Sequence, residues 1–279
     1  MSELVFVKLG GSVITDKTQP ETVRPETLSR LAKEVASALS VGSIPSPSSG
    51  QGLRVVLGHG SGSFGHMVAN RHGTRKGVRS VADWQGFAGV AAVAARLNRI
   101  VTDAFLAAGV PVWSIQPSAS ARCQGGELVS LETFTVEQAL GRGLVPLLYG
   151  DVALDDVLGG TIISTEQVFA YLARHLRPAR LILAGVADGV FEGDPLRDPS
   201  SRHIPEISSA NWHGVRALLG ASHGIDVTGG MRAKVDEMVN LARDVPGLEV
   251  IILSGERVGA LKTALLTPSK VLGGTRIHW

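Results

Sequence analysis

Short runs of apolar residues alternate along this chain with longer segments in which apolar residues recur at helical spacing. Each short run has the length of a buried strand; these runs cover residues 3–9, 53–57, 110–115, 144–148, 181–184 and 250–253. The helical segments begin at Pro25, at residue 83, at the capping-box pattern Ser164-x-x-Gln167 and at Met231. This alternation predicts an α/β fold with a mostly parallel central sheet covered on both faces, a three-layer αβα sandwich.

The composition is typical of a globular protein and argues against several classes of function. Hydrophobic residues make up 44% of the chain, and the formal net charge of +2 comes without any Lys/Arg tract, so nucleic-acid binding is not expected. The single cysteine, Cys123, permits no internal disulfide, and no apolar run approaches the ~20 residues of a transmembrane helix. We therefore expect a cytoplasmic protein without membrane insertion. Residues 41–52, rich in Ser, Pro and Gly, predict a surface insertion.

A glycine-rich segment follows the second predicted strand and reads His59-Gly-Ser-Gly-Ser-Phe-Gly-His66. Its glycines allow the backbone to approach an anion and turn N–H groups towards it, and His66 adds a further donor. The same segment spells the dinucleotide-binding fingerprint at Gly60, Gly62 and Gly65. In that fold a ribose-binding acid ends a second strand, whereas residues 75–82 here are basic and interrupted. The pattern therefore favours phosphate binding.

Two further glycine-rich turns accompany basic residues. Lys8-Leu-Gly-Gly-Ser12 follows the first strand, with Lys17 shortly after it, and residues 226–234 lead through Gly229-Gly230 into a helix that carries Lys234. In a parallel sheet such turns meet at the carboxyl edge. Lysines there neutralise the repulsion between two phosphorylated ligands, which is most of what phosphoryl transfer requires of a protein.

The motifs also carry a family resemblance. Lys-Leu-Gly-Gly-Ser-Val-Ile-Thr at 8–15 resembles the opening of the amino-acid-kinase superfamily, and Gly-Ser-Phe-Gly-His at 62–66 resembles the isopentenyl phosphate kinase family within it. Further matches follow in the same order along nearly the whole chain, at residues 116–119, 149–152, 187–191 and 226–231.

The resemblance implies an amino-acid-kinase fold and ATP-dependent phosphorylation of isopentenyl phosphate to isopentenyl diphosphate. It implies ATP and Mg²⁺ as cofactors, no metal ligand from the protein, a homodimer, and a single domain of residues 1–279. Within it an acceptor-binding lobe covers about 1–150 and a nucleotide-binding lobe about 151–279. The implied catalytic residues are Lys8, Lys17, His66, Asp151 and Lys234. The implied substrate-binding residues are Ser61, His66, Thr165, Trp84 and Phe87, and the implied ATP-binding residues are Lys8, Gly10, Gly11, Ser12, Gly62, Asp188, Gly230 and Lys234.

One motif departs from the family pattern. Where the family has Ile-Ser-Gly-Asp, this chain has Ile163-Ser164-Thr165-Glu166, so Thr165 replaces a glycine that would contact substrate, and Glu166 carries its acid one methylene further. For the prenyl tail, Trp84, Phe87 and Val90 form an apolar stripe at helical spacing. We expect Ile162 and Ile163 as its opposing walls.

Other interpretations of these residues stay open. Asp151 and Asp188 are also typical of turns, and an apolar stripe is also typical of core packing. A related kinase acting on a phosphonate such as fosfomycin would share His66, and a non-catalytic nucleotide-binding protein would share the fold. A polar lining of the tail slot would favour the phosphonate.

Overall fold

An eight-stranded sheet forms the centre of the protein in a computed structural model, which describes residues 2–41, 52–65, 73–193, 195, 198, 200–221 and 230–279. The strand order is β12-β14-β13-β9-β1-β2-β6-β3, and every neighbouring pair is parallel except β13 and β14. The predicted parallel sheet is confirmed. Its strands are β1 (Glu3–Leu9), β2 (Leu53–His59), β3 (Val112–Ser114), β6 (Val145–Tyr149), β9 (Arg180–Gly185), β12 (Glu206–Ile207), β13 (Glu249–Ser254) and β14 (Thr275–Ile277).

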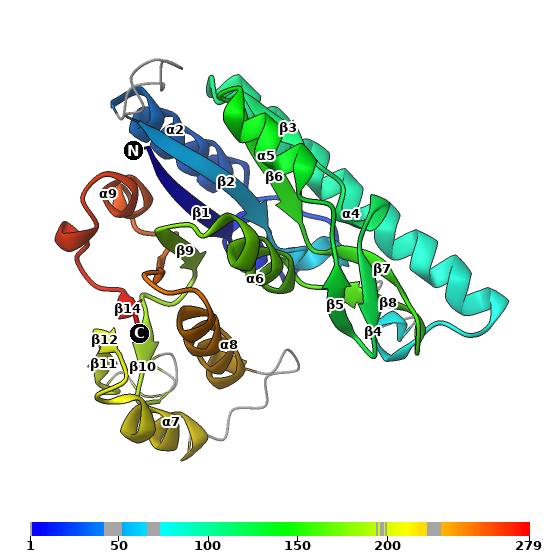
Figure 1. Ribbon diagram of the computed structural model, residues 1–279. Coiled ribbons are helices and arrows are strands. Elements are labelled where there is room, and N and C mark those ends of the chain that lie inside the picture. The colour runs from blue at the N-terminus through cyan, green and yellow to red at the C-terminus, as the bar shows by residue number, and fades with distance from the viewer. Residues whose placement is uncertain are drawn as a thin grey trace.

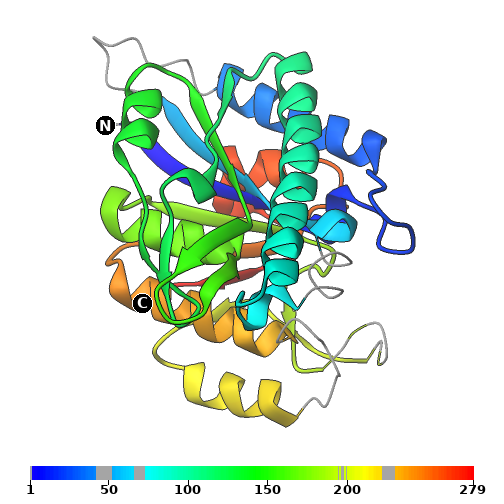
Figure 2. The ribbon, with the colours of Figure 1, turned by 90° about the vertical axis from the view of Figure 1, so that its right-hand side faces the viewer.

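Helices cover both faces of this sheet (Figures 1 and 2). Side chains of β1 alternate between two buried clusters, with Leu4 and Phe6 in one and Val5, Val7 and Leu9 in the other. The first cluster is completed by α5 (Phe134–Gly141), α6 (Thr165–Leu176), α7 (Trp212–Ala221) and α8 (Gly230–Asp244). The second is completed by α1 (Gly11–Ile14), α2 (Pro25–Val41), α4 (Val81–Ala107) and α9 (Ala260–Leu266). These are the three layers predicted from the pattern.

A smaller four-stranded sheet, which the hydrophobic pattern does not predict, is formed by two strands that precede β6 in the chain and two that follow it. Its order is β5-β4-β7-β8, made of β4 (Arg122–Gln124), β5 (Glu127–Ser130), β7 (Asp151–Asp155) and β8 (Gly159–Ile163). Asp155 ties two of its turns together, because its carboxylate accepts hydrogen bonds from the backbone N–H groups of Gly125, Gly126, Val157 and Leu158. β7 and β8, which follow the predicted lobe boundary at 150/151, lie in one sheet with β4 and β5, which precede it. The division into two lobes at this position stays a prediction.

The remaining elements are short. The predicted starts of α2 and α6 are confirmed, whereas α4 begins two residues and α8 one residue before the predicted positions. β10 (Val190–Phe191) pairs with β11 (His203–Ile204), and η1 (Thr74–Lys76), η2 (Pro117–Ala119) and η3 (Pro268–Lys270) are single 3₁₀ turns. α2 begins at Pro25, and in the capping box Ser164 Oγ accepts from Gln167 N at 3.0 Å while Gln167 Oε1 accepts from Ser164 N at 2.9 Å. The predicted insertion lies almost entirely outside the described residues. Among those described, no helix is long and apolar enough to cross a membrane.

Candidate active site

The first two glycine-rich turns interlock at the carboxyl ends of β1 and β2. A Cβ on Gly11 would lie 2.3 Å from the backbone N of Gly62 and 2.6 Å from its Cα, and a Cβ on Gly60 would lie 3.0 Å from Gly11 N. Gly60 N also donates to Leu9 O at 3.0 Å. Only glycine permits this backbone-to-backbone contact, so the convergence expected from the sequence is present at these two turns.

Thr15 holds the second turn in place. Its hydroxyl donates to Gly11 O at 2.7 Å and accepts from Ser63 N at 2.9 Å. Gly62 has a φ of 50°, and a Cβ there would lie 2.1 Å from Thr15 Oγ1. Ser61 O then accepts from the N–H groups of Phe64 and Gly65, which begins a helical turn. His66, the residue expected to bind the acceptor phosphate, and the turn at 226–229 lie outside the described residues.

A cavity beside these turns brings two of the predicted lysines together. Lys8 reaches it from β1 and Lys234 from α8, and Gly10 also lines it. The other described lining residues are Glu166, Leu183, Ala184, Gly185, Val186, Ala187, Met231 and Ile252. Gly230 is the first residue of α8, one turn before Lys234. Ser12 is half-buried in α1, and Lys17 is exposed on the turn between α1 and α2, outside this described lining.

The carboxylate that contacts Lys8 is Glu166, which the implied set of site residues omits. The two side chains form an ion pair and are only 11% and 14% exposed. Burial opposes ionisation of Glu166, but the charge and hydrogen bond of Lys8, together with the charge of Lys234, outweigh it and lower the pKa of the carboxyl group. Glu166 is therefore an anion between two cations. The sequence indicates Glu166 only through the motif Ile163-Ser164-Thr165-Glu166, in which Glu166 stands where the family pattern has an aspartate.

A second acid, Glu237, shares this electrostatic field. It lies three residues after Lys234 on α8, so the two side chains are on the same side of the helix. Burial and then the negative charge of Glu166 raise the pKa of Glu237 to about 7. No motif in the sequence singles out this residue; only its spacing from Lys234 does.

Asp151 and Thr165 lie near the site, with contacts of a different kind from those expected. Asp151 accepts from Ser118 N at 3.2 Å and Val152 N at 2.8 Å, and burial raises the pKa of its carboxyl group. Thr165 is buried and donates its hydroxyl to His59 O at 2.6 Å, which links the start of α6 to the end of β2. A lysine-orienting role for Asp151 and a substrate contact from Thr165 both stay predictions.

His59, a buried and neutral histidine at the end of β2, directly precedes the second glycine turn. His59 Nε2 lies 3.2 Å from Asn98 Oδ1, and its ring stacks on Tyr149 with centroids 5.6 Å apart. Burial lowers the pKa of His59 to about 4, so the ring is uncharged near neutral pH. The ring therefore adds no charge at the start of the turn.

The apolar stripe on α4 faces a pair of glycines. Trp84 and Phe87 meet edge to face with ring centroids 5.3 Å apart, and Trp84 is 40% exposed. A Cβ on Gly160 would lie 2.9 Å from the Phe87 ring, so β8 approaches this ring closely. Ile162 lies on the same face of β8 as Gly160 by strand alternation. The expectation for Ile163 is wrong, because it points the opposite way and is buried in the first core cluster.

Asp188 connects the two strands that border the cavity. Its carboxylate accepts from Ser254 N at 3.2 Å and forms an ion pair with Arg257. Its neighbour Ala187 lines the cavity. Asp188 therefore holds the end of β13 against the turn after β9, and its nucleotide contact stays a prediction.

Interlocked glycine turns and paired lysines at the carboxyl edge of a parallel sheet define a phosphate-handling site, and the model of the amino acid kinase family matches residues 3–254. The chain belongs to this family. It is 34% identical to the isopentenyl phosphate kinase of Methanothermobacter thermautotrophicus over 98% of both chains, and 38% identical to that of Haloferax volcanii over 85% of this chain and 88% of the relative. A solved structure of isopentenyl phosphate kinase superposes with a TM-score of 0.80 at 31% identity, covering 98% of this chain and 99% of that one. The resemblance drawn from the motifs is confirmed.

Proposed function

We propose that this protein transfers the γ-phosphoryl group of ATP to isopentenyl phosphate, forming isopentenyl diphosphate and ADP. The observation that carries the proposal is the cavity in which Lys8, Lys234 and Gly10 meet beside the interlocked Gly11 and Gly62. Nearly full-length similarity to isopentenyl phosphate kinases supports the choice of substrate. The reaction breaks the bond between the γ-phosphorus and its bridging oxygen and forms a bond to an acceptor phosphate oxygen.

The chemistry of the acceptor explains why cations matter here more than a base. A phosphate monoester carries about −1.5 to −2 charges at neutral pH, so its oxygen is already an anion and its approach to ATP is opposed by repulsion. Lys8 and Lys234 neutralise that charge, and Glu166 fixes the ammonium of Lys8. We assign His66 and the backbone of Ser61 to the acceptor phosphate. Lys17 and the backbone N–H groups of residues 11, 12 and 62 are assigned to the transferring and nucleotide phosphates. Gly10, whose N–H already donates to Ala184 O at 2.8 Å, is assigned to the cavity wall beside them.

Magnesium enters this scheme with the nucleotide. Mg²⁺ is usually bound by one or two carboxylates at most, together with substrate phosphates and water. Within the described ranges no three His, Cys, Asp or Glu side chains gather into a metal-binding group. We therefore propose the phosphate oxygens of ATP as the main ligands. When bound, the ion supplies further neutralisation of phosphate charge.

The prenyl tail is proposed to lie against Trp84 and Phe87. Two aromatic rings suit an apolar five-carbon chain, and Gly160 lets the Phe87 ring pack closely against β8. This lining disfavours a small polar phosphonate such as fosfomycin.

The assembly and the compartment belong to the same proposal. β3 forms one edge of the central sheet, and its Trp113 is 46% exposed. A second copy that covers this edge would give the expected homodimer, which light scattering after size exclusion would detect. We propose that the reaction takes place in the cytoplasm, where the single cysteine stays reduced.

The test is an ADP-release assay with isopentenyl phosphate, dimethylallyl phosphate or fosfomycin as acceptor. We expect turnover with the prenyl phosphates and none with fosfomycin. Lys234→Met should abolish it, and Lys33→Met, an exposed lysine of α2, should leave it unchanged. No ADP release with either prenyl phosphate would overturn the proposal.

A further inference from the structure

The wall of the nucleotide cavity is held by the end of β13. Gly255 N donates to Gly185 O at 2.7 Å, and Ser254 Oγ donates to Val186 O at 3.1 Å. Gly185 and Val186 both line the cavity. A Cβ on Gly255 would lie 3.0 Å from Val13, so the loop also packs against the helical turn that follows the first glycine turn. The position of the loop after β13 therefore determines the shape of this wall.

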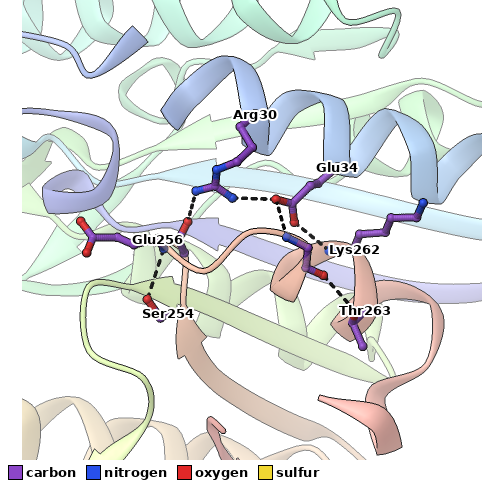
Figure 3. A network of polar contacts seen from close by, with 8 residues as sticks. Arg30, Glu34, Ser254, Glu256, Lys262 and Thr263 are labelled. Carbon is purple, nitrogen blue, oxygen red and sulfur yellow. Dashed lines mark hydrogen bonds and ion pairs between the residues drawn. The ribbon is translucent and has the colours of Figure 1, made fainter. Parts of the chain in front are cut away.

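An ion pair on α2 holds both ends of that loop. Glu34, which is 8% exposed, accepts from Gly259 N at 3.0 Å and from Lys262 N at 3.2 Å. Arg30 donates one guanidinium N–H to Glu34 at 2.6 Å and another to Gly255 O at 2.5 Å. Figure 3 shows both side chains pointing from α2 towards the segment that carries Glu256 and Lys262.

The chemistry of these contacts suits positioning rather than stability alone. The planar guanidinium donates in two fixed directions, so Arg30 sets the distance between Glu34 and the carbonyl of Gly255. Gly259 has a φ of 79°, and an added Cβ there would meet no atom within 4 Å, so no side-chain packing at this residue fixes the loop. Without the pair, the segment between Gly255 and Gly259 would be fixed mainly by backbone contacts.

On the basis of the function proposed above, we propose that Arg30 and Glu34 are positioning residues that set the affinity for ATP by fixing the 255–259 loop and the first turn of α9 against the cavity wall at 185–187. They act through the loop and do not contact the nucleotide. Both line an open groove of about 600 Å³ between α2 and α9, apart from the described lining of the site cavity. Their substitution therefore replaces no residue of that lining and acts only through the position of the loop.

The experiment compares Glu34→Gln and Arg30→Lys with the wild-type protein. Gln keeps one acceptor oxygen and loses the charge, whereas the Lys ammonium keeps the charge and loses the two-directional fork. We expect KM for ATP, and the Kd for the non-hydrolysable analogue AMP-PNP measured by calorimetry, to rise roughly threefold to tenfold, the loss expected of about one hydrogen bond. KM for isopentenyl phosphate and kcat should stay within about twofold, the pattern of lost uniform binding.

The matched control is Glu256→Gln. Glu256 lies on the same loop and forms an exposed ion pair with Arg24, so its substitution should change neither KM for ATP nor the Kd for AMP-PNP. An unchanged Kd for AMP-PNP in both variants would overturn the inference, as would equal rises in both KM values. If Glu34→Gln does not fold, Arg30→Lys decides. If the wild-type protein binds AMP-PNP but does not phosphorylate a prenyl phosphate, the proposed function fails and the Kd comparison still tests this inference.

Discussion

Gly11 is the position where a single methyl group would most directly separate the two glycine turns. In Gly11→Ala the new Cβ would lie 2.3 Å from Gly62 N and 2.6 Å from Gly62 Cα. Real Cβ atoms essentially never come closer than 3.0 Å to a heavy atom of a residue that is not a chain neighbour, so the turns must separate by about 0.7 Å at the least. Neither turn can move freely, because Gly10 N donates a hydrogen bond to Ala184 O at 2.8 Å and Gly60 N donates one to Leu9 O at 3.0 Å.

The size of the effect follows from the geometry of phosphoryl transfer. In the proposed mechanism, the first turn and the adjacent Lys8 at the end of β1 bind ATP phosphates, and Ser61 and His66 of the second turn bind the acceptor phosphate. A misplacement of about 1 Å between reacting groups costs on the order of a hundredfold in rate. We therefore expect kcat/KM of Gly11→Ala to fall roughly tenfold to a hundredfold, equivalent to about 1.4 to 2.7 kcal/mol of transition-state stabilisation.

Steady-state kinetics with isopentenyl phosphate and ATP, together with the melting temperature of each variant, separate this effect from unfolding. Gly141→Ala is the matched control, because a Cβ there meets no atom within 4 Å and Gly141 lies in a helix. It should behave as the wild-type protein. If folded Gly11→Ala keeps kcat/KM within about threefold of the wild-type value, close approach of the turns is not required for catalysis and the reasoning is refuted.

Three further substitutions test other parts of the site. Glu166→Gln should lower kcat roughly tenfold or more, because Lys8 loses the carboxylate that orients it; Asp156→Asn, which breaks an exposed ion pair, is the control in the same kinetic assay. Glu237→Gln should stabilise the protein by about 1–3 kcal/mol at pH 8 and not at pH 4. In the folded wild-type protein Glu237 has a pKa of about 7, whereas in the unfolded chain it has the ordinary value of 4.5. The free energy of unfolding of the wild-type protein therefore falls as pH rises between these two values. Equal urea unfolding curves for the wild-type protein and Glu237→Gln at pH 8 would contradict this. Gly160→Ala should push Phe87 into the tail slot and raise KM for isopentenyl phosphate about threefold while KM for ATP is unchanged; a rise in both constants would argue against the slot.

The sequence predicts six of the eight strands of the large sheet, because strands buried on both faces leave continuous apolar runs, and it misses the short strands β12 and β14 at one edge. β1 has the predicted bounds, 3–9, and the predicted runs at 181–184 and 250–253 each lie within a strand that is one residue longer at either end. The small sheet leaves no such signal. β4 and β5 have three and four residues. Asp151 and Asp155 in β7 look like turn residues, although both are buried and bonded to backbone N–H groups.

The site divides in the same way between local and long-range signals. Close approach of two backbones requires glycine, so the contact between Gly11 and Gly62 is written into the sequence as two glycine-rich turns. The ion pair of Lys8 with Glu166 joins residues 158 positions apart, and no local pattern specifies it. The Arg30–Glu34 pair looks in sequence like an ordinary surface pair at i,i+4. The positioning role proposed for this pair depends on its hydrogen bonds to Gly255 and Gly259, and only the folded structure brings these residues together.

The departure at Thr165 and Glu166 is best understood as a single coupled change. A glycine at 165 would remove the hydroxyl group that donates a hydrogen bond to the carbonyl oxygen of His59. It would also remove the methyl group that packs against Gly58, where an added Cβ would lie 2.7 Å from that methyl group. Thr165 therefore ties the start of α6 to the end of β2. From that fixed start, the longer side chain of Glu166 reaches Lys8. Thr165→Gly should then weaken the orientation of Lys8 together with the second glycine turn, and we expect the Thr165→Gly/Glu166→Asp double variant to recover more activity than either single change predicts, since the two positions act as one unit.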